Sequence, residues 1–456
     1  MMRSSAIVKL SLLLLGVAVV LSGCFGAKPV LEEMGEEDKG ILKVLYYDED
    51  SFYLEYGNAF NAKFPNIELN VVSTKELMQK RANDESFDYR SELTKWIELH
   101  KPDVLLLGRN DYEAYAQEGK LYNLESIIKQ ERFDVEGYMP GLIDGLRASG
   151  GGSLYGLTPY FFTRVLYYNA DLFTGNGIEP PHNGMAWEEL LRLAARFAKA
   201  GTKDAPVYGL DASDGDAAAL LDSIARTMKL QLFDEQGQQV LLQSEGWKEA
   251  FRLTADAVRS GAVKVLGPGE GVSYFPSDDR FVNGQAAMVI AGPSLAYNIN
   301  DTSYSKKAKK FEWGMVSVPV DRADPGKTPF ASYRETFAIS AQAANNRVAW
   351  EFIKYAAGPD RARADAQGMI YQLPTRIGIV KDINGKSAEP LYALTPMEEN
   401  GERAGKNVPK SFEVAYTPLL NEALQAVIGE TKTVDEALAN LQQQAQATLQ
   451  AARNGK

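Results

Sequence analysis

The residues that most often carry enzyme chemistry are few or isolated in this sequence. The two histidines, His100 and His182, lie far apart and lack partners at the spacing of a zinc site or a Ser-His-Asp triad. The run Gly150-Gly151-Gly152 lacks the Lys-Ser/Thr ending of a phosphate-binding loop and is typical of a turn. Acidic residues are abundant, so a polysaccharide-active lipoprotein enzyme that uses a pair of carboxylates is kept as an alternative. Our main prediction is a protein that is not an enzyme and has no metal ion or cofactor.

The only cysteine, Cys24, follows a segment typical of secreted proteins. A positively charged start precedes an apolar run over residues 10–21, as in a signal peptide. The sequence Leu21-Ser22-Gly23-Cys24 resembles a bacterial lipobox, in which the cysteine is lipidated and becomes the first residue of the mature chain. We therefore predict a lipoprotein signal peptide over residues 1–23, a palmitate-type anchor on Cys24 and a flexible acidic stalk over residues 24–40. The anchor would hold the protein at the outer face of the bacterial cell membrane.

Length and charge limit the architecture and the partners. A chain of 456 residues is too long for one hydrophobic core, which predicts two lobes. The formal net charge of −11 argues against nucleic acid as a partner. It does not argue against a neutral ligand.

Charged and amide side chains follow two predicted strands of the N-terminal half. Residues 41–47 and 104–107 are apolar runs, residues 67–72 alternate between apolar and polar, and helical stretches separate the three. This order predicts a largely parallel sheet with helices on both faces, which binds ligands at the carboxyl ends of its strands. That rule selects Asp48, Glu49, Arg109, Asn110 and Asp111.

Residues 153–173 are the predicted connection between the two halves. They are rich in aromatic and β-branched residues, and Pro159 interrupts them because it cannot donate to a ladder. We predict two extended pieces, of which Phe161–Tyr168 is a strand that crosses between lobes. The aromatic side chains here, including Tyr160 and Phe162, could instead belong to the core.

A second alternation of helices and strands follows. The apolar run over residues 286–294 predicts a return crossing to the first lobe, residues 311–319 a strand in that lobe, and residues 333–340 a third crossing. The predicted N-terminal lobe therefore comprises residues 41–160 and 289–335, and the predicted C-terminal lobe residues 161–288 and 336–456. Thr433 and Glu436 form a capping-box pattern that predicts the start of the last helix.

Several short motifs follow one another along the chain. They are Tyr155-Gly156-Leu157-Thr158-Pro159-Tyr160, Leu166-Tyr167-Tyr168-Asn169-Ala170-Asp171, Trp187-Glu188-Glu189-Leu190, Phe281-Val282-Asn283-Gly284-Gln285, Gly292-Pro293-Ser294, Trp313-Gly314-Met315 and Ala349-Trp350-Glu351-Phe352. Together with the lipobox, their order resembles the extracellular solute-binding proteins of carbohydrate-type ABC importers over nearly the whole mature chain.

The resemblance implies an α/β protein with the two-lobe type II periplasmic-binding-protein fold, in which mixed sheets are flanked by helices and crossing strands join the lobes. It implies a monomer that captures a mono- or oligosaccharide by hinge closure and delivers it to the transmembrane subunits of an ABC permease. A ligand-sensing subunit for a receptor kinase is a further alternative. The positions that match the family's ligand-binding cleft are Asp48, Glu49, Asn110, Asp111, Tyr160 and Phe162, with Tyr274, Tyr297, Tyr333, Arg334 and Tyr371 as further candidates.

Overall fold

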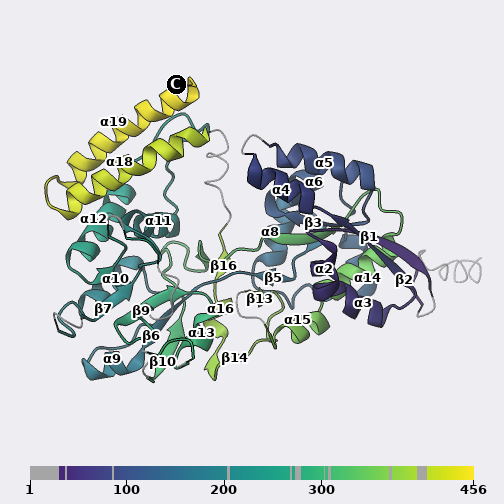
Figure 1. Cartoon of the computed structure of the whole chain (residues 1–456), viewed down its shortest axis with the longest axis horizontal. Helices are drawn as coiled ribbons and strands as arrows, with labels where there is room; N and C mark the ends of the chain where they lie inside the picture. The colour runs from purple at the N-terminus through teal and green to yellow at the C-terminus, as the bar shows by residue number, and fades with distance from the viewer. Residues whose placement is uncertain are drawn as a thin grey trace, which may run out of the picture.

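The computed structural model describes most of the chain and shows two lobes side by side, each built on one five-stranded sheet (Figure 1). The described residues are 30–35, 38–84, 87–202, 206–267, 270–272, 279–301, 303–306, 310–368, 372–397 and 408–455. The predicted signal peptide, the lipidation candidate Cys24 and the ligand-binding candidates Tyr274 and Tyr371 lie outside these residues. Among the helices in the described ranges, none has the length and apolar character needed to cross a membrane.

The first lobe contains a mixed sheet in the strand order β2-β1-β3-β12-β4. Its strands are β1 (Gly40–Tyr46), β2 (Ile67–Ser73), β3 (Val104–Gly108), β4 (Gly156–Leu157) and β12 (Glu335–Ile339). The first three are parallel, as the sequence predicts, and β12 runs antiparallel to both β3 and β4. Gly156 allows the close approach of β4 to β12, because a Cβ atom there would lie 2.6 Å from the carbonyl oxygen of Phe337.

Helices cover both faces of this sheet (Figure 1). They are α2 (Glu49–Phe52), the π-helix η2 (Tyr53–Gly57), α3 (Asn58–Lys63), α4 (Lys75–Asn83), α5 (Tyr89–His100), α6 (Arg109–Gln117), α7 (Glu125–Glu131), α8 (Leu142–Ser149), α14 (Asn346–Ala356) and α15 (Pro359–Asp365). The fully buried ring of Phe352 on α14 packs against Phe52, Phe60 and Phe337. This aromatic cluster joins α14 to the N-terminal helices, although nearly 300 residues separate them in the sequence.

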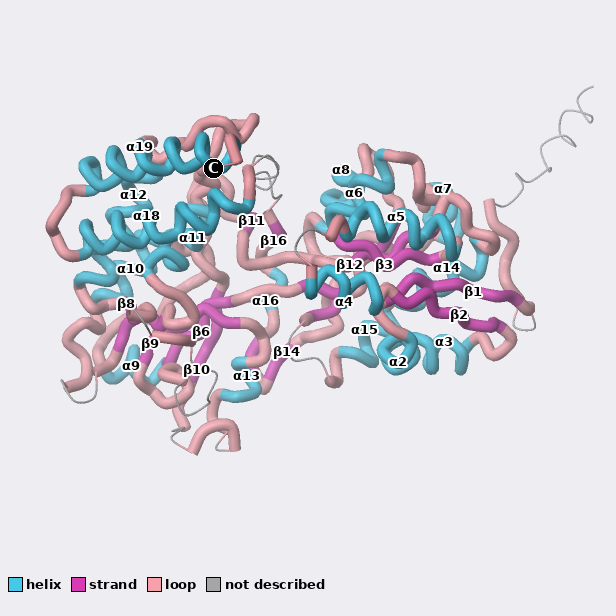
Figure 2. The backbone as a smooth tube through the Cα atoms, turned by 45° about the horizontal axis from the view of Figure 1, so that its top comes forward, coloured by secondary structure: helices cyan, strands magenta, loops and turns pink. Residues whose placement is uncertain are grey.

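The second lobe contains a sheet in the order β10-β6-β9-β7-β8. Its strands are β6 (Val165–Asn169), β7 (Tyr208–Asp211), β8 (Val263–Lys264), β9 (Ala286–Ala291) and β10 (Trp313–Val316). The central strand pair is antiparallel, with Val165 opposite Ala291. The helices are α9 (Ala170–Gly175), α10 (Trp187–Ala195), α11 (Ala217–Thr227), α12 (Glu245–Arg259), α13 (Leu295–Asn298), α18 (Lys410–Ile428) and α19 (Val434–Arg453). The last two pack on α11 and α12 at one side of this lobe (Figure 2).

The strand pairing corrects the predicted lobe boundaries. β9 and β10 pair with β6 in the second sheet, so residues 286–294 are not a return crossing and β10 does not belong to the first lobe. β12 pairs with β3 and β4, which places residues 335–339 in the first sheet and not in the C-terminal lobe. The error arises because an apolar strand fits either sheet equally well, and only its hydrogen-bonded partner decides between them.

Three segments cross between the lobes. The first leaves β4, passes through β5 (Tyr160–Phe161) and enters β6, as the sequence predicts. The second passes through β11 (Lys327–Thr328) into β12, and the third contains β13 (Leu373–Pro374), which pairs with β5. Beyond β13 the chain forms β14 (Asp382–Ile383), β15 (Lys386–Ser387), α16 (Glu389–Tyr392) and β16 (Thr395–Pro396), the last paired with β11. β5 and β13 lie between the two lobes in Figure 1.

The buried side chains form two large clusters and not one undivided core. One cluster fills the first lobe and continues past the crossing segments to Tyr167, Phe281 and Trp313. The other lies between the opposite face of the second sheet, including Leu166 and Met288, and the helices α10, α11, α12, α18 and α19.

Candidate ligand-binding site

In both sheets, the edge at the carboxyl ends of the parallel strands lies near the crossing segments. In the first lobe, Gly108 at the carboxyl end of β3 pairs with Glu335, where β12 enters from the second lobe. In the second lobe, Val289 near the end of β9 pairs with Asp211 at the end of β7, next to the point where β6 begins. The carboxyl ends of the parallel strands of both lobes therefore lie near the crossings, where α/β sheets usually bind ligands.

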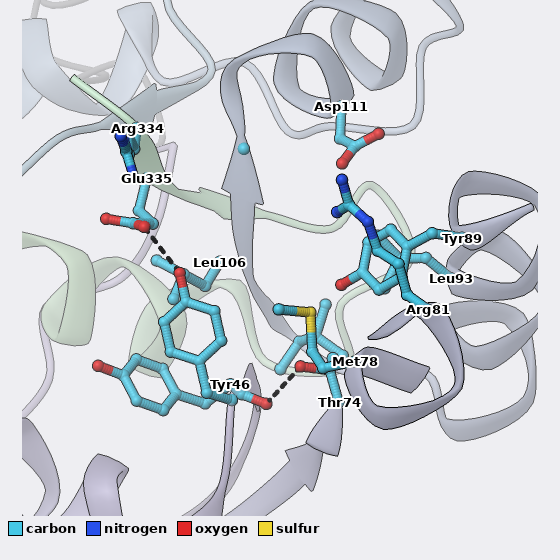
Figure 3. Close-up of a pocket in the computed structure, with 13 residues that line it drawn as sticks. Tyr46, Thr74, Met78, Arg81, Tyr89, Leu93, Leu106, Asp111, Arg334 and Glu335 are labelled. Carbon is cyan, nitrogen blue, oxygen red and sulfur yellow. Dashed lines mark hydrogen bonds between the residues drawn. The ribbon is translucent and has the colours of Figure 1, made fainter. Parts of the chain in front are cut away.

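A pocket of about 190 Å³ opens at this edge of the first sheet (Figure 3). Its lining mixes apolar, aromatic and charged side chains from the ends of β1, β2 and β3, the helices α4, α5 and α6, and the start of β12. The lining residues are Leu45, Tyr46, Tyr47, Thr74, Met78, Arg81, Tyr89, Leu93, Leu106, Gly108, Asp111, Arg334 and Glu335. Apolar walls with a few polar groups are typical of sites for small molecules.

Local hydrogen bonds fix the two strand ends that form the floor of this pocket. The backbone amide of Thr74 donates to the carbonyl oxygen of Tyr46 at 2.8 Å, and the hydroxyl of Thr74 donates to the same oxygen at 3.2 Å (Figure 3). The carboxylate of Asp48 accepts bonds from the amide and hydroxyl of Ser51 at 2.9 and 2.8 Å and so caps α2. Tyr47 lies in the sequence between Tyr46 and Asp48, the two residues whose positions these hydrogen bonds fix.

Tyr47 and Glu335 connect the ends of β1 and β12 across the pocket. The phenol of Tyr47 donates to a carboxylate oxygen of Glu335 at 2.7 Å. Partial burial and the adjacent carboxylate raise the pKa of Tyr47 above its usual range, so the phenol keeps its proton at neutral pH. The ring remains 39% exposed and presents a flat apolar face with a polar tip.

Asp111 and Arg81 occupy the other side of the pocket, where the two side chains point toward one another from α6 and α4 (Figure 3). Burial raises the pKa of the Asp111 carboxyl, while the guanidinium groups of Arg90 and Arg81 act in the opposite direction. The Arg81 guanidinium also lies over the ring of Tyr89, 5.2 Å from its centroid. Groups of this kind can bond to hydroxyls or charges on a ligand.

Two further arginines flank the pocket on the side of the crossings. Arg109, the first residue of α6, lies 5.6 Å from the ring centroid of the buried Tyr333. Arg334 lies 5.2 Å from the centroid of Phe162, which pairs with Ser332 in the crossing ladder. Each of these two arginines thus contacts an aromatic ring, and of these four residues only Arg334 lines the pocket itself.

Several predicted binding residues have other roles in this structure. Asp48 is occupied as the cap of α2, and its bonds to Ser51 lower the pKa of its carboxyl. Glu49 and Asn110 are exposed in the first turns of α2 and α6 and do not line the pocket.

The hydroxyl of Tyr160 is already occupied as well. It donates to Asp365 on α15, whose carboxylate pairs with Arg361 at 2.5 Å. Burial and the Asp365 charge raise the pKa of Tyr160. We conclude that this tyrosine ties the first crossing segment to α15, so it serves positioning in this conformation.

The second lobe contributes its own polar groups at the facing edge. Arg164, which precedes β6, pairs with Asp214 at 2.9 Å, and Ser213 bonds to Asp211 at the end of β7. Tyr297 on α13 also belongs to this lobe and is 41% exposed. Of the sequence candidates that lie within the described ranges, the pocket in the first lobe brings together only Asp111 and Arg334.

Sequence reasoning missed Tyr47, Arg81, Tyr89 and Glu335 as lining residues. Tyr47 is the last residue of the predicted strand over residues 41–47, whereas β1 ends at Tyr46, so the strand-end rule began one residue too late, at Asp48. Arg81 and Tyr89 lie on helices α4 and α5, and no sequence signal relates them to the sheet edge. Within the described ranges, no group of three or more histidine, cysteine or carboxylate side chains is placed to hold a metal ion.

Comparison with known proteins identifies the relatives of this chain. Residues 46–362 match the family model described as bacterial extracellular solute-binding protein. A protein of Brucella abortus (strain 2308), described as a binding protein, is 25% identical over 277 residues, which are 59% of this chain and 59% of that protein. The match thus spans less than two thirds of this relative.

Solved structures share the fold over a greater length. A sugar transporter of Rhizobium etli in an open conformation has a TM-score of 0.61 at 21% identity, with 89% of this chain and 99% of that chain covered. The sugar-binding protein MalE of Xanthomonas citri has a TM-score of 0.60 at 18% identity, with 91% and 98% covered. At these identities the likeness concerns the two-lobe fold.

Proposed function

The chain belongs to the bacterial extracellular solute-binding protein family, and from this premise we propose that it is the subunit of an ABC importer that captures a carbohydrate, a mono- or oligosaccharide, between its two lobes. The observation that carries the proposal is the pocket at the edge of the first sheet that faces the crossings. The names of the sugar transporter of Rhizobium etli and of the sugar-binding MalE of Xanthomonas citri support the choice of a sugar.

The side chains at this edge suit a saccharide. A sugar presents C–H faces that an exposed ring such as Tyr47 covers, and hydroxyls that need fixed partners once water is expelled. Asp111 and Glu335 supply such partners from the first lobe. Asp211 and Ser213 would approach from the second lobe when the lobes close.

Closure is the proposed signal to the permease. A ligand that touches both lobes only in the closed state shifts the equilibrium toward that state, and the permease recognises the closed shape. The crossing segments are bonded to one another by short ladders, so we expect them to bend as a unit when the lobes move. This is hinge motion about a few residues.

The remaining parts of the proposal concern location and chemistry. We propose that the chain acts as a monomer tethered through a lipid on Cys24 to the outer face of the cell membrane, and that it does no chemistry on its ligand. The lipobox supports the tether, and the family, which consists of binding proteins, supports the absence of catalysis.

A thermal-shift screen tests the proposed function. Ligand at about 100 times its Kd stabilises the folded state by about 2.7 kcal/mol, which is a measurable rise in Tm. We expect a rise with one or more saccharides. A rise with amino acids, peptides or polyamines and none with any saccharide would overturn the proposal, and release of shorter products from oligosaccharides would indicate an enzyme instead.

A further inference from the structure

Two guanidinium groups at the facing edge of the first lobe have no carboxylate partner in the part of the chain that the structure describes. Arg109 and Arg334 make a ring contact each, with Tyr333 and Phe162 respectively, and neither forms an ion pair with a described residue. Their backbones are neighbours, because Gly108 and Glu335, the residues next to them, pair in the β3–β12 ladder. Two positive charges thus stand at adjacent strand ends.

The carboxylates around them are engaged elsewhere. Glu335 accepts the Tyr47 hydroxyl at 2.7 Å, and Asp111 lies in the fields of Arg81 and Arg90. Across the edge, Asp214 is paired with Arg164 at 2.9 Å. Glu335 and Asp214 could reach the two arginines only by giving up these partners, and the side chain of Asp111 points toward Arg81 on the other side of the pocket (Figure 3).

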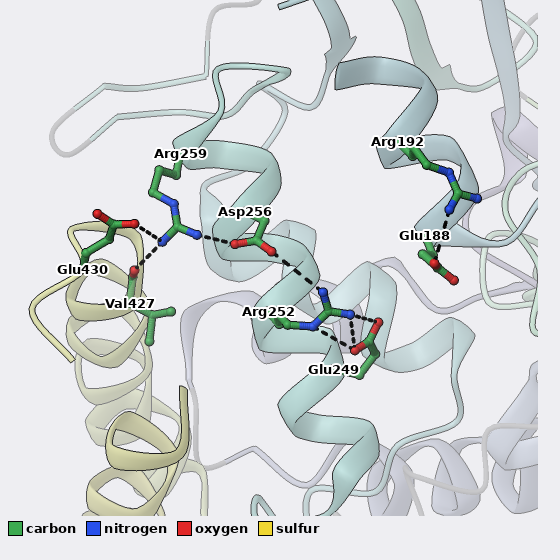
Figure 4. Close-up of polar contacts among 8 residues, drawn as sticks. All are labelled: Glu188, Arg192, Glu249, Arg252, Asp256, Arg259, Val427 and Glu430. Atoms are coloured by element: carbon green, nitrogen blue, oxygen red, sulfur yellow. Dashed lines mark hydrogen bonds and ion pairs between the residues drawn. The ribbon is translucent and has the colours of Figure 1, made fainter. Parts of the chain in front are cut away.

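Arginines on an open surface of the second lobe show the contrast (Figure 4). Along α12, Arg252 pairs with Glu249 at 2.5 Å, and Arg259 pairs with Asp256 and, at 3.4 Å, with Glu430. On α10, Arg192 pairs with Glu188 at 3.4 Å. These surface arginines pair with carboxylates, whereas Arg109 and Arg334 beside the pocket lie over aromatic rings.

The stacked geometry leaves these arginines able to bind an anion. A guanidinium that lies on an aromatic face keeps its in-plane N–H groups free, and their fork matches the oxygens of a carboxylate or phosphate. Lobe closure would also take both charges out of water, which is unfavourable unless an anion accompanies them. We infer that the saccharide carries an anionic group, a uronate carboxylate or a phosphate ester, and that Arg109 and Arg334 recognise it next to the crossings. This inference rests on the proposed function.

Calorimetric titration of the full chain with matched ligands tests the inference. The probes are short oligogalacturonides, short oligoglucuronates and glucose 6-phosphate, each compared with its carboxyl-reduced or dephosphorylated counterpart. We expect an acidic ligand to bind at least about tenfold more tightly than its neutral counterpart, with an advantage that shrinks as salt is added. The uronate and phosphate arms identify which anion is recognised.

Substitutions connect the preference to the two arginines. Arg109→Gln and Arg334→Gln should each weaken the acidic ligand about tenfold and change the neutral ligand less than about threefold. Arg192→Gln on α10 is the control and should leave both affinities unchanged, because its pair with Glu188 lies on another surface.

Three outcomes would overturn the inference. If acidic and neutral saccharides bind equally, the proposed function stands, but the inference that the ligand carries an anionic group is wrong. If both glutamine variants weaken neutral and acidic saccharides alike, the arginines pair with carboxylates of the second lobe on closure instead. If no saccharide of either kind binds while another solute does, the proposed function itself is wrong.

Discussion

The backbone amide of Phe162 donates a hydrogen bond to the carbonyl oxygen of Ser332 at 2.7 Å, and the amide of Ser332 donates back to Phe162 at 2.9 Å. The two residues belong to different crossing segments, one leading into β6 and the other into β12. Arg164 extends the ladder with a bond to Phe330 at 3.1 Å. The connection between the lobes is therefore a paired ribbon, which limits the directions in which the lobes can move.

The first prediction concerns the buried threonine pair where this ribbon meets the first sheet. The hydroxyls of Thr158 and Thr336 lie 2.9 Å apart, and both residues are fully buried. Thr336→Val should lower the free energy of unfolding by about 1–3 kcal/mol, because it leaves the Thr158 hydroxyl buried without this partner. Urea unfolding measures the loss.

The double variant Thr158→Val with Thr336→Val is the matched control. It removes both hydroxyls, so most of the lost stability should return. The single variant Thr158→Val is measured as well. If the losses of unfolding free energy in the two single variants simply add in the double variant, the two hydroxyls do not depend on one another.

The second prediction concerns Glu131, which joins α7 to α14. It accepts bonds from Arg347 at 2.5 Å and from Lys354 at 2.6 Å. Burial alone would raise the pKa of Glu131, but the bonds from these cations outweigh it and lower the pKa below the ordinary value of 4.5. The stabilisation is then complete above pH 4.5 and is lost as the pH falls through the lower, folded-state value.

Glu131→Gln should accordingly lower the free energy of unfolding by about 2 kcal/mol at neutral pH. The difference in unfolding free energy between variant and wild type should become smaller in acid. Glu92→Gln is the control, because the Glu92–Lys95 pair is exposed and should change stability by less than about 0.5 kcal/mol. A gap that stays constant down to pH 3 would contradict the pKa assignment.

The third prediction concerns the exposed ring of Tyr47. Tyr47→Ala should weaken saccharide binding about tenfold, since the variant loses an aromatic face worth about 1 kcal/mol as well as the hydroxyl. Tyr47→Phe keeps the face and should lose less affinity. Calorimetric titration of both variants decides, and equal losses would assign the effect to the hydroxyl bond with Glu335.

The fourth prediction concerns the lipid anchor. Cys24→Ala should move the protein from the membrane fraction to the medium or periplasm and abolish labelling with a palmitate analogue, because a single chain-terminal anchor is the proposed attachment. Fractionation with immunoblotting measures the distribution. Persistent membrane association of the variant would refute the tether on Cys24.

Local patterns predicted the elements of this fold well. The alternation in residues 67–72 became β2, the capping box at Thr433 starts α19, and residues 153–173 link β4 to β6. These features depend on neighbouring residues alone, so their signals are visible in the sequence. The sequence analysis predicts no helix over residues 410–428, where the structure has α18 with Pro418 in its interior, a residue that usually ends a helix.

The sheet assignment of β9 and β10, and most of the pocket, could not be predicted in the same way. Whether β10 pairs with β6 or with a strand of the first lobe depends on long-range packing. Arg81 and Glu335 reach one pocket from helices and strands more than 250 residues apart. Tyr160 was selected by residue type, and its bond to Asp365 on α15 is a tertiary contact that the sequence does not reveal. Its role in ligand binding stays a prediction.

The central claim is that the two lobes close on a small solute. Small-angle X-ray scattering of the protein, first alone and then with a saturating ligand identified by thermal shift, tests it most directly. The account predicts a smaller radius of gyration with ligand, because the lobes approach one another about the Phe162–Ser332 ribbon. A radius of gyration that is the same with and without a bound ligand would contradict it.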